Sequence, residues 1–145
     1  MQIQGQTALV TGAGSGPGEA VARELHRQGA RVALVDLDGS KVDRLADELG
    51  RDRALALVAD VADTAQLGAA LDACEASIGA PRIVMNVAGI GPPKRILSKD
   101  GNPAPLEDFE RVPRINLTGT YNVIRLATAR IARLAPLEDD ERASW

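Results

Sequence analysis

Hydrophobic and polar positions follow two alternating patterns along this chain. Short continuous apolar runs, typical of strands buried in a parallel sheet, occur at residues 8–10, 32–35, 54–59 and 83–87. Between these runs, apolar residues recur at helical spacing over about residues 17–28, 40–49 and 64–78. Gly29, Gly50 and Gly79 follow the three helical stretches and are typical helix stop signals.

This alternation predicts an α/β fold, namely a Rossmann-like doubly wound parallel sheet with helices on both faces. The expected strand order is 3-2-1-4. With 145 residues, 45% of them hydrophobic, the chain can bury one modest core, so we expect a single domain over residues 1–145. Residues 91–105 are rich in Pro, Gly, Lys and Asp and predict a long surface loop.

Residues 106–134 return to helical periodicity. Pro113 lies inside this stretch, where it should remove one hydrogen bond and bend the helix axis. Such a bend either belongs to the turn around Asn116 or misplaces that residue.

Local signals refine the other helices. Ser40, with Asp43 three residues later, resembles a capping box, and Asp63 or Thr64 is expected to start the third helix. Cys74 lies on the apolar stripe of that helix and is expected to pack in the core. His26 is on the polar side of the first helix with no metal ligands near it in sequence, so we expect a surface residue and no metal site.

The charge distribution narrows the possible partners. The net charge is −3, the isoelectric point is about 5.2, and Lys and Arg are scattered among acids, which disfavours nucleic-acid binding. No apolar run approaches the roughly 20 residues that span a bilayer. The first residues have neither the basic nor the apolar part of a signal peptide. We therefore expect a cytoplasmic protein without a membrane partner.

A run of small residues follows the first apolar strand and opens the first helix: Thr11-Gly12-Ala13-Gly14-Ser15-Gly16-Pro17-Gly18. Glycines there allow a tight turn and let a dinucleotide pyrophosphate approach the backbone N–H groups at the helix N-terminus. Asp36 ends the second strand, twenty residues after Gly16, where its carboxylate can accept hydrogen bonds from an adenosine ribose. Its charge would repel the extra phosphate of NADP, and neither residues 13–15 nor Leu37 supply an arginine, so the expected cofactor is NAD.

Two further motifs follow the third and fourth strands, namely Asp60-Val61 and Asn86-Val87-Ala88-Gly89. Together with the glycine run and the segment Arg114–Gly119, they resemble the short-chain dehydrogenase/reductase family. The stretches 106–112 and 119–126 are similar, more narrowly, to type-2 3-hydroxyacyl-CoA dehydrogenases.

The resemblance implies a role for each motif. Ser15 and the backbone around Pro17 would contact the pyrophosphate, Asp36 the adenosine ribose, and Asp60 and Val61 the adenine. The tetrapeptide from Asn86 to Gly89 would line the cofactor cleft. A structural role is an alternative for two of these residues, because Asp60 could cap a strand end and Asn86 could satisfy backbone groups between strands.

The chain also departs from the family pattern. Members of the family use a serine, a Tyr-x-x-x-Lys pair and an assisting asparagine, and of these only the asparagine, Asn116, is present. The sole tyrosine, Tyr121, is followed four residues later by Arg125, and arginine does not replace lysine there, so we expect Tyr121 to pack or lie on the helix surface. The sequence is therefore interpreted as a truncated, cofactor-binding half of an enzyme, with a sheet incomplete on the catalytic side. Pro17 also lacks the N–H that relatives offer to a phosphate.

Three hypotheses remain. The first is an NAD-dependent oxidoreductase whose small-molecule substrate is a 3-hydroxyacyl-CoA or a related secondary alcohol. In this hypothesis the protein is expected to form a homo-oligomer. The alternative is a non-catalytic nucleotide-binding or dimerisation module. A third, another doubly wound class such as a methyltransferase, is disfavoured by the motifs at Asn86 and Asn116.

Overall fold

A parallel sheet forms the centre of the molecule. The computed structural model describes residues 2–91 and 95–137, and its strands are β1 (Thr7–Thr11), β2 (Arg31–Asp36), β3 (Ala54–Val58) and β4 (Ile83–Asn86). Their order is β3-β2-β1-β4, and every neighbouring pair is parallel. The predicted fold class and strand order are confirmed.

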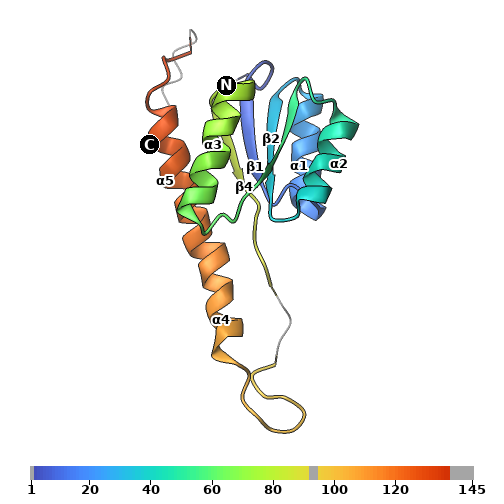
Figure 1. Ribbon diagram of the computed structural model, residues 1–145, viewed down its shortest axis with the longest axis vertical. Helices are drawn as coiled ribbons and strands as arrows, with labels where there is room; N and C mark the ends of the chain where they lie inside the picture. Colours follow the sequence, from blue (N-terminus) through green and yellow to red (C-terminus); the bar gives the residue numbers. More distant parts are fainter. Residues whose placement is uncertain (1, 92–94, 138–145) are drawn as a thin grey trace.

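Helices cover both faces of this sheet (Figure 1). On one face lie α1 (Gly16–Arg27) and α2 (Gly39–Leu49), and on the other lie α3 (Thr64–Ile78) and α5 (Thr120–Ile131). Successive residues of a strand point to opposite faces, so β1 contributes to two separate cores. Ala8 and Val10 pack toward α1 and α2, whereas Leu9 packs toward α3 and α5, and all three are fully buried.

The boundaries of the strands and helices differ slightly from those expected, and the N-cap of α2 is a different residue. The third and fourth strands each end one residue early, and α1 begins at Gly16 instead of Pro17. The proposed capping box of Ser40 and Asp43 is wrong, because Asp38 caps α2 and accepts a bond from the Lys41 N–H at 3.4 Å. The Ser40 hydroxyl instead donates to Asp38 Oδ1 at 2.6 Å.

The start of α3 agrees with one of the two expected residues. Asp63 is its N-cap, and its carboxylate accepts bonds from the N–H groups of Ala65 and Gln66 at 2.9 and 3.0 Å. Cys74 is fully buried in the core, as expected, and burial raises the pKa of its thiol to about 11.

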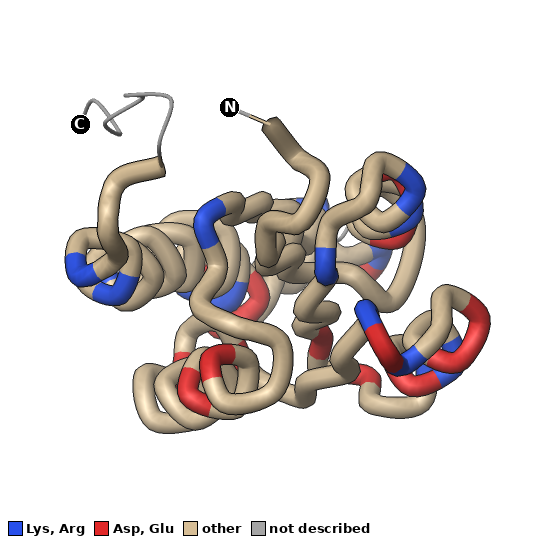
Figure 2. Tube along the Cα trace, turned by 90° about the horizontal axis from the view of Figure 1, so that it is seen from above, with Lys and Arg blue, Asp and Glu red and all other residues tan. Residues whose placement is uncertain are grey.

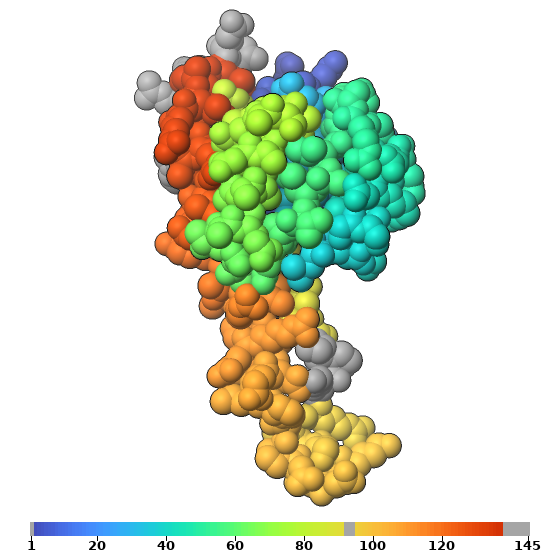
Figure 3. Space-filling view, viewed as in Figure 1, coloured from blue at the N-terminus to red at the C-terminus, as the bar shows by residue number. Residues whose placement is uncertain are grey.

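The helical stretch after residue 105 is divided into three segments. These are α4 (Leu106–Pro113), the π-helix η1 (Arg114–Gly119) and α5. The wider π turn begins directly after Pro113, whose missing N–H leaves one carbonyl of the preceding turn without its helical partner. The loop before α4 and α4 itself project beyond the sheet as a narrow extension (Figure 3), and α4 has no buried residue.

His26 differs from expectation. It is half-buried at the end of α1, and its Nε2 is enclosed without a hydrogen-bond partner in the described part of the chain. Arg53, just before β3, crosses to this helix end and donates to the backbone carbonyls of His26 and Ala30 at 3.1 and 3.2 Å. Placing His26 on the surface was therefore wrong, because helical periodicity does not reveal what a neighbouring loop places over a helix end.

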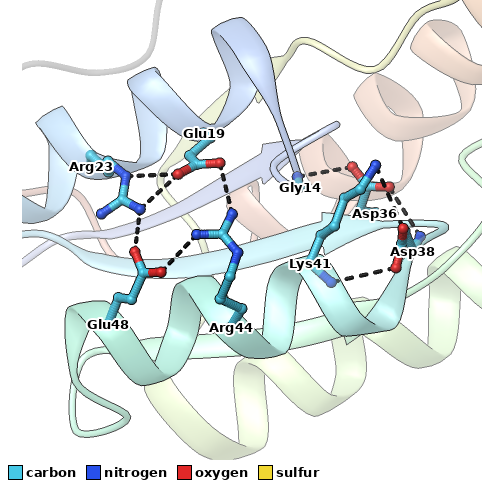
Figure 4. Close-up of polar contacts among 8 residues, drawn as sticks. All are labelled: Gly14, Glu19, Arg23, Asp36, Asp38, Lys41, Arg44 and Glu48. Atoms are coloured by element: carbon cyan, nitrogen blue, oxygen red, sulfur yellow. Dashed lines mark hydrogen bonds and ion pairs between the residues drawn. The ribbon is translucent and has the colours of Figure 1, made fainter.

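A closed set of ion pairs joins α1 to α2 (Figure 4). Glu19 accepts from Arg23 Nε at 2.9 Å and from Arg44 Nη2 at 3.0 Å, and Glu48 pairs with the same two arginines. The hydrogen bond from Arg23 is the largest cause that lowers the pKa of both carboxyls. The network connects the helix that follows the glycine run to the helix that follows Asp36.

Elsewhere, basic and acidic residues are interleaved around the fold (Figure 2). Within residues 2–91 and 95–137, no helix combines the length and apolar character needed to cross a membrane.

Candidate functional site

The glycine run lies where β1, β4 and α1 meet, and its backbone packs too tightly for side chains. A Cβ on Gly18 would lie 1.9 Å from the carbonyl oxygen of Gly12, and a Cβ on Gly12 would lie 2.8 Å from the backbone nitrogen of Ala88. Gly12 and Gly16 also have positive φ angles of 68° and 53°, which L side chains rarely adopt. This run therefore brings the first turn of α1 against the carboxyl ends of two strands.

The N-terminus of α1 opens into a hollow. Its N-cap, Ser15, makes no side-chain capping bond, and Pro17 is the second helical residue, one position later than expected. The hollow has a volume of about 280 Å³ and is lined by Gly12, Ser15, Gly16, Pro17, Gly18, Asp36, Val87, Ala88 and Gly89. Backbone N–H groups in a first helical turn have no intrahelical partner, so this position suits an anion.

Asp36 forms one wall of the hollow and is held by two backbone groups. Its Oδ2 accepts from the Gly14 N–H at 2.9 Å, and its Oδ1 accepts from the Asp38 N–H at 3.0 Å (Figure 4). A carboxylate has about four lone-pair positions, so these bonds fix its orientation and leave capacity for hydroxyl donors.

A second, adjoining groove lies beyond Asp36. Its volume is about 140 Å³, and its lining consists of Gly12, Val35, Asp36, Leu37, Ala59, Asp60, Val61, Ala88, Gly89, Ile90, Arg111 and Ile115. Most of these side chains are apolar, which suits a flat ring. The two grooves share Gly12, Asp36, Ala88 and Gly89 and so form one continuous surface.

Asp60 makes a backbone contact and also lines the second groove. Its Oδ1 accepts from the Ala62 N–H at 2.8 Å, which is the structural alternative, and it also lines the second groove. Its Oδ2 pairs with Arg114 of η1 at 2.9 Å. This ion pair ties the loop after β3 to the π-helix.

Asn86 is the one residue of its tetrapeptide that lines neither groove. It ends β4 opposite Thr11 and is exposed. The backbone role considered for Asn86 belongs in part to Thr11, whose hydroxyl oxygen accepts from the N–H groups of Val87 and Ala88 at 3.2 Å each. Val87, Ala88 and Gly89 do line the grooves.

Asn116 lies in η1 beside the loop after β4. Its Oδ1 accepts from the Ile90 N–H and its Nδ2 donates to the Ile90 carbonyl, both at 2.8 Å. The Asn116 carbonyl accepts from the Thr120 hydroxyl at 2.7 Å. The bend expected at Pro113 takes the form of this π turn, which brings Asn116 against the loop after β4.

Tyr121 lies on the surface, with 66% of its area exposed. Arg125, four residues later, is directed away from it and donates to Asn122 Oδ1 and to the Thr64 hydroxyl. The two side chains do not form a Tyr-Lys-like pair.

Asn122 supports the site and was missed by the sequence reasoning. Its buried side chain donates to the Val61 carbonyl at 2.8 Å and accepts from the Thr64 hydroxyl at 3.2 Å. It thereby holds the loop after β3 against α5. The available signal was its helical spacing, because Asn122 lies four and five residues before Leu126 and Ala127 and so shares their side of the helix.

Among residues 2–91 and 95–137, no three His, Cys, Asp or Glu side chains come together in a way that could hold a metal ion.

Comparison with known proteins identifies relatives that match nearly all of this chain. The family model described as short chain dehydrogenase matches residues 6–134. The chain is 38% identical to 3-hydroxyacyl-CoA dehydrogenase type-2 of Drosophila melanogaster, over 97% of this chain and 55% of that protein. It therefore spans about half the length of the curated relatives that it matches.

Solved structures of similar proteins agree with these sequence matches. The 3-hydroxyacyl-CoA dehydrogenase type-2 of Mycobacterium avium superposes with a TM-score of 0.82 at 38% identity, covering 94% of this chain and 53% of that one. The 3-ketoacyl-(acyl-carrier-protein) reductase of Brucella melitensis, complexed with NADH, gives 0.80 at 36% identity, covering 88% and 51%. By its fold, its glycine run and the match over residues 6–134, the chain belongs to the short-chain dehydrogenase family.

Proposed function

We propose that residues 1–145 are one NAD-binding domain of a short-chain dehydrogenase. The observation that carries this proposal is the continuous groove from the N-terminus of α1, past Asp36, to Asp60 and Val61. Its parts match a dinucleotide in order: an anion position, a fixed carboxylate and an apolar slot. The pyrophosphate would lie at Ser15 and the first turn of α1, the ribose at Asp36, and the adenine against Val61.

The nicotinamide end would lie along Val87–Gly89. The Brucella reductase to which this chain is similar was solved with NADH, which supports a nicotinamide dinucleotide as the ligand. Such a cofactor exchanges a hydride with a secondary alcohol or a ketone. Asn116 would act by holding the backbone of Ile90, and with it the loop that lines the cleft.

The preference for NAD rests on Asp36. Its carboxylate faces the groove and is held by Gly14 and Asp38, so a phosphate on the ribose 2′ oxygen would meet a fixed negative charge. In the proposed complex the same oxygens accept hydrogen bonds from the free ribose hydroxyls.

The proposed substrate is a 3-hydroxyacyl-CoA or a related secondary alcohol. Its support is the similarity to type-2 3-hydroxyacyl-CoA dehydrogenases, which covers nearly all of this chain. Proton transfer in the family uses a serine and a Tyr-x-x-x-Lys pair, and these 145 residues contain no such pair. We therefore expect this segment alone to bind dinucleotide without turnover and to regain turnover with the C-terminal half of a relative. The cytoplasmic location stays a prediction.

Calorimetric titration of the purified chain with NADH and NADPH tests the proposal. We expect tighter binding of NADH, and Asp36→Ala should narrow the gap between the two cofactors. Asp100→Ala, which removes the same charge from the exposed loop before α4, should leave the gap unchanged. Tighter binding of NADPH by the unaltered chain would overturn the assignment of NAD.

A second candidate, a non-catalytic nucleotide-binding or dimerisation module, is supported by a different observation. Large apolar side chains lie exposed along α4, η1 and α5, namely Leu106, Phe109, Leu117, Tyr121 and Ile124. A surface of this kind fits association, including a homo-oligomer. Turnover by the hybrid with a relative's C-terminal half would favour the enzyme, whereas tight association without turnover in that hybrid would favour the module.

A further inference from the structure

The cation beside Asp36 comes from the next helix, not from the residues adjoining it in sequence. Lys41 is in the first turn of α2. A Cβ placed on Gly14 would lie 2.9 Å from Asp36 Oδ2 and 3.1 Å from Lys41 Cβ. Lys41 and Asp36 thus flank the same glycine, and Figure 4 shows the Lys41 side chain running alongside Asp36.

The Lys41 ammonium is held loosely. Its Nζ lies 3.5 Å from Asp38 Oδ2, and half of the Lys41 side chain is exposed. Asp38 in turn donates its N–H to Asp36 Oδ1. An exposed ion pair of this length is weak, so the ammonium can leave Asp38 for a stronger acceptor.

A phosphate is such an acceptor, because it carries more charge than a carboxylate and forms charge-assisted hydrogen bonds. In the proposed complex, the ribose 2′ oxygen lies at Asp36, and Lys41 is the cation next to it. We propose that Lys41 is a second specificity-determining residue, which attracts a ribose 2′-phosphate that Asp36 repels. This inference rests on the proposed function, since it assumes that the ribose lies at Asp36.

The opposite charges of Asp36 and Lys41 have a measurable effect on cofactor preference. With Asp36 in place, the carboxylate dominates and NADH is preferred. Without that carboxylate, the Lys41 ammonium remains beside the ribose position, so NADPH should gain affinity relative to NADH and the gap between the two cofactors should narrow. Lys41 therefore sets how far the preference moves when Asp36 is removed.

The experiment compares NADH and NADPH binding by calorimetry in four chains: unaltered, Lys41→Ala, Asp36→Ala, and the double variant. Lys41→Ala should weaken NADPH binding about fivefold, the size of one exposed ion pair, and leave NADH within about twofold. The double variant should lose the gain in NADPH affinity shown by Asp36→Ala. Lys99→Ala, the same charge change in the exposed loop before α4, should change neither cofactor.

The outcomes separate the two proposals. If NADH binds and Lys41→Ala leaves the ratio of NADH to NADPH affinity unchanged in both backgrounds, the role of Lys41 is wrong while the dinucleotide site stands. An equal effect of Lys99→Ala would reduce the result to net charge and also overturn it. If neither cofactor binds a chain shown to be folded by circular dichroism, the dinucleotide site and the role of Lys41 are both wrong.

Discussion

Asn116 and Ile90 are joined by a reciprocal pair of hydrogen bonds, each 2.8 Å long, between a side chain of η1 and the backbone of the loop after β4. An asparagine amide matches a peptide group, with one donor and one acceptor side by side. The pair therefore connects the π-helix to the loop that lines the candidate site.

Asn116→Ala removes both bonds and leaves the Ile90 groups to water. Because the pair is partly exposed, we expect the free energy of unfolding to fall by about 1–2 kcal/mol, measured by urea denaturation. Asn116→Asp keeps the acceptor for the Ile90 N–H but places a negative oxygen against the Ile90 carbonyl, so it should also be destabilising. An unchanged urea midpoint for Asn116→Ala would show that these bonds contribute nothing.

The sequence predicted the features that depend on local chemistry. The period of apolar residues predicted the sheet and its helices, and the spacing from Gly16 to Asp36 predicted two walls of one groove, because parallel strands end at the same edge. These inferences needed only chain connectivity and side-chain type.

What the sequence did not predict depends on packing between distant segments. Neither residues 13–15 nor Leu37 supply a cation at Asp36. Lys41 does, because α2 folds back beside the glycine run, a contact that the sequence does not reveal. The π turn after Pro113 was expected only as a bend, since the wider hydrogen-bond pattern has no distinctive composition. Asn86 carried a family motif, yet its side chain lies outside both grooves.

The apolar surface of the long helix should cause self-association. Leu117, Tyr121 and Ile124 follow one another at spacings of four and three residues and are 70%, 66% and 48% exposed. We expect the unaltered chain to sediment as more than a monomer at tens of micromolar. Leu117→Glu with Ile124→Glu should shift it toward monomer.

Ala129→Glu is the matched control, because it adds a charge to the same helix at an exposed position off this stripe. It should leave the sedimentation coefficient unchanged. A sharp monomer peak for the unaltered chain would contradict the prediction.

His26 should make stability depend on pH below neutrality. Burial, followed by the nearby charge of Arg53, lowers its pKa below the ordinary value of 6.5. As pH falls below 6.5, the unfolded chain takes up a proton that the folded chain resists, so the free energy of unfolding decreases. That stability is fully present above pH 6.5 and is lost as pH falls toward the folded-state pKa.

His26→Gln removes this titration. Urea midpoints between pH 7.5 and about 5.5, above the range where most carboxyls titrate, should therefore be flatter for the variant than for the unaltered chain. Parallel pH profiles would show that His26 takes up its proton equally well in the folded state.

Pro17 should weaken cofactor binding without weakening the fold. It is the second residue of α1, where its missing N–H would have no intrahelical partner, so the helix loses little. A pyrophosphate at this helix end would lose one hydrogen bond to a charged acceptor, worth about 1.5–3 kcal/mol, or roughly a ten- to hundredfold change in affinity. Pro17→Leu should therefore tighten NADH binding by this factor and shift thermal unfolding of the unliganded chain only slightly.

Adenosine provides the control for this substitution, because it has the ring and ribose but no phosphate. Its affinity should be the same with proline or leucine at position 17, whereas ADP-ribose should follow NADH. If Pro17→Leu leaves the affinity for NADH unchanged, the backbone at this position does not donate to the diphosphate. The phosphates would then have to lie nearer Gly12, in the same hollow.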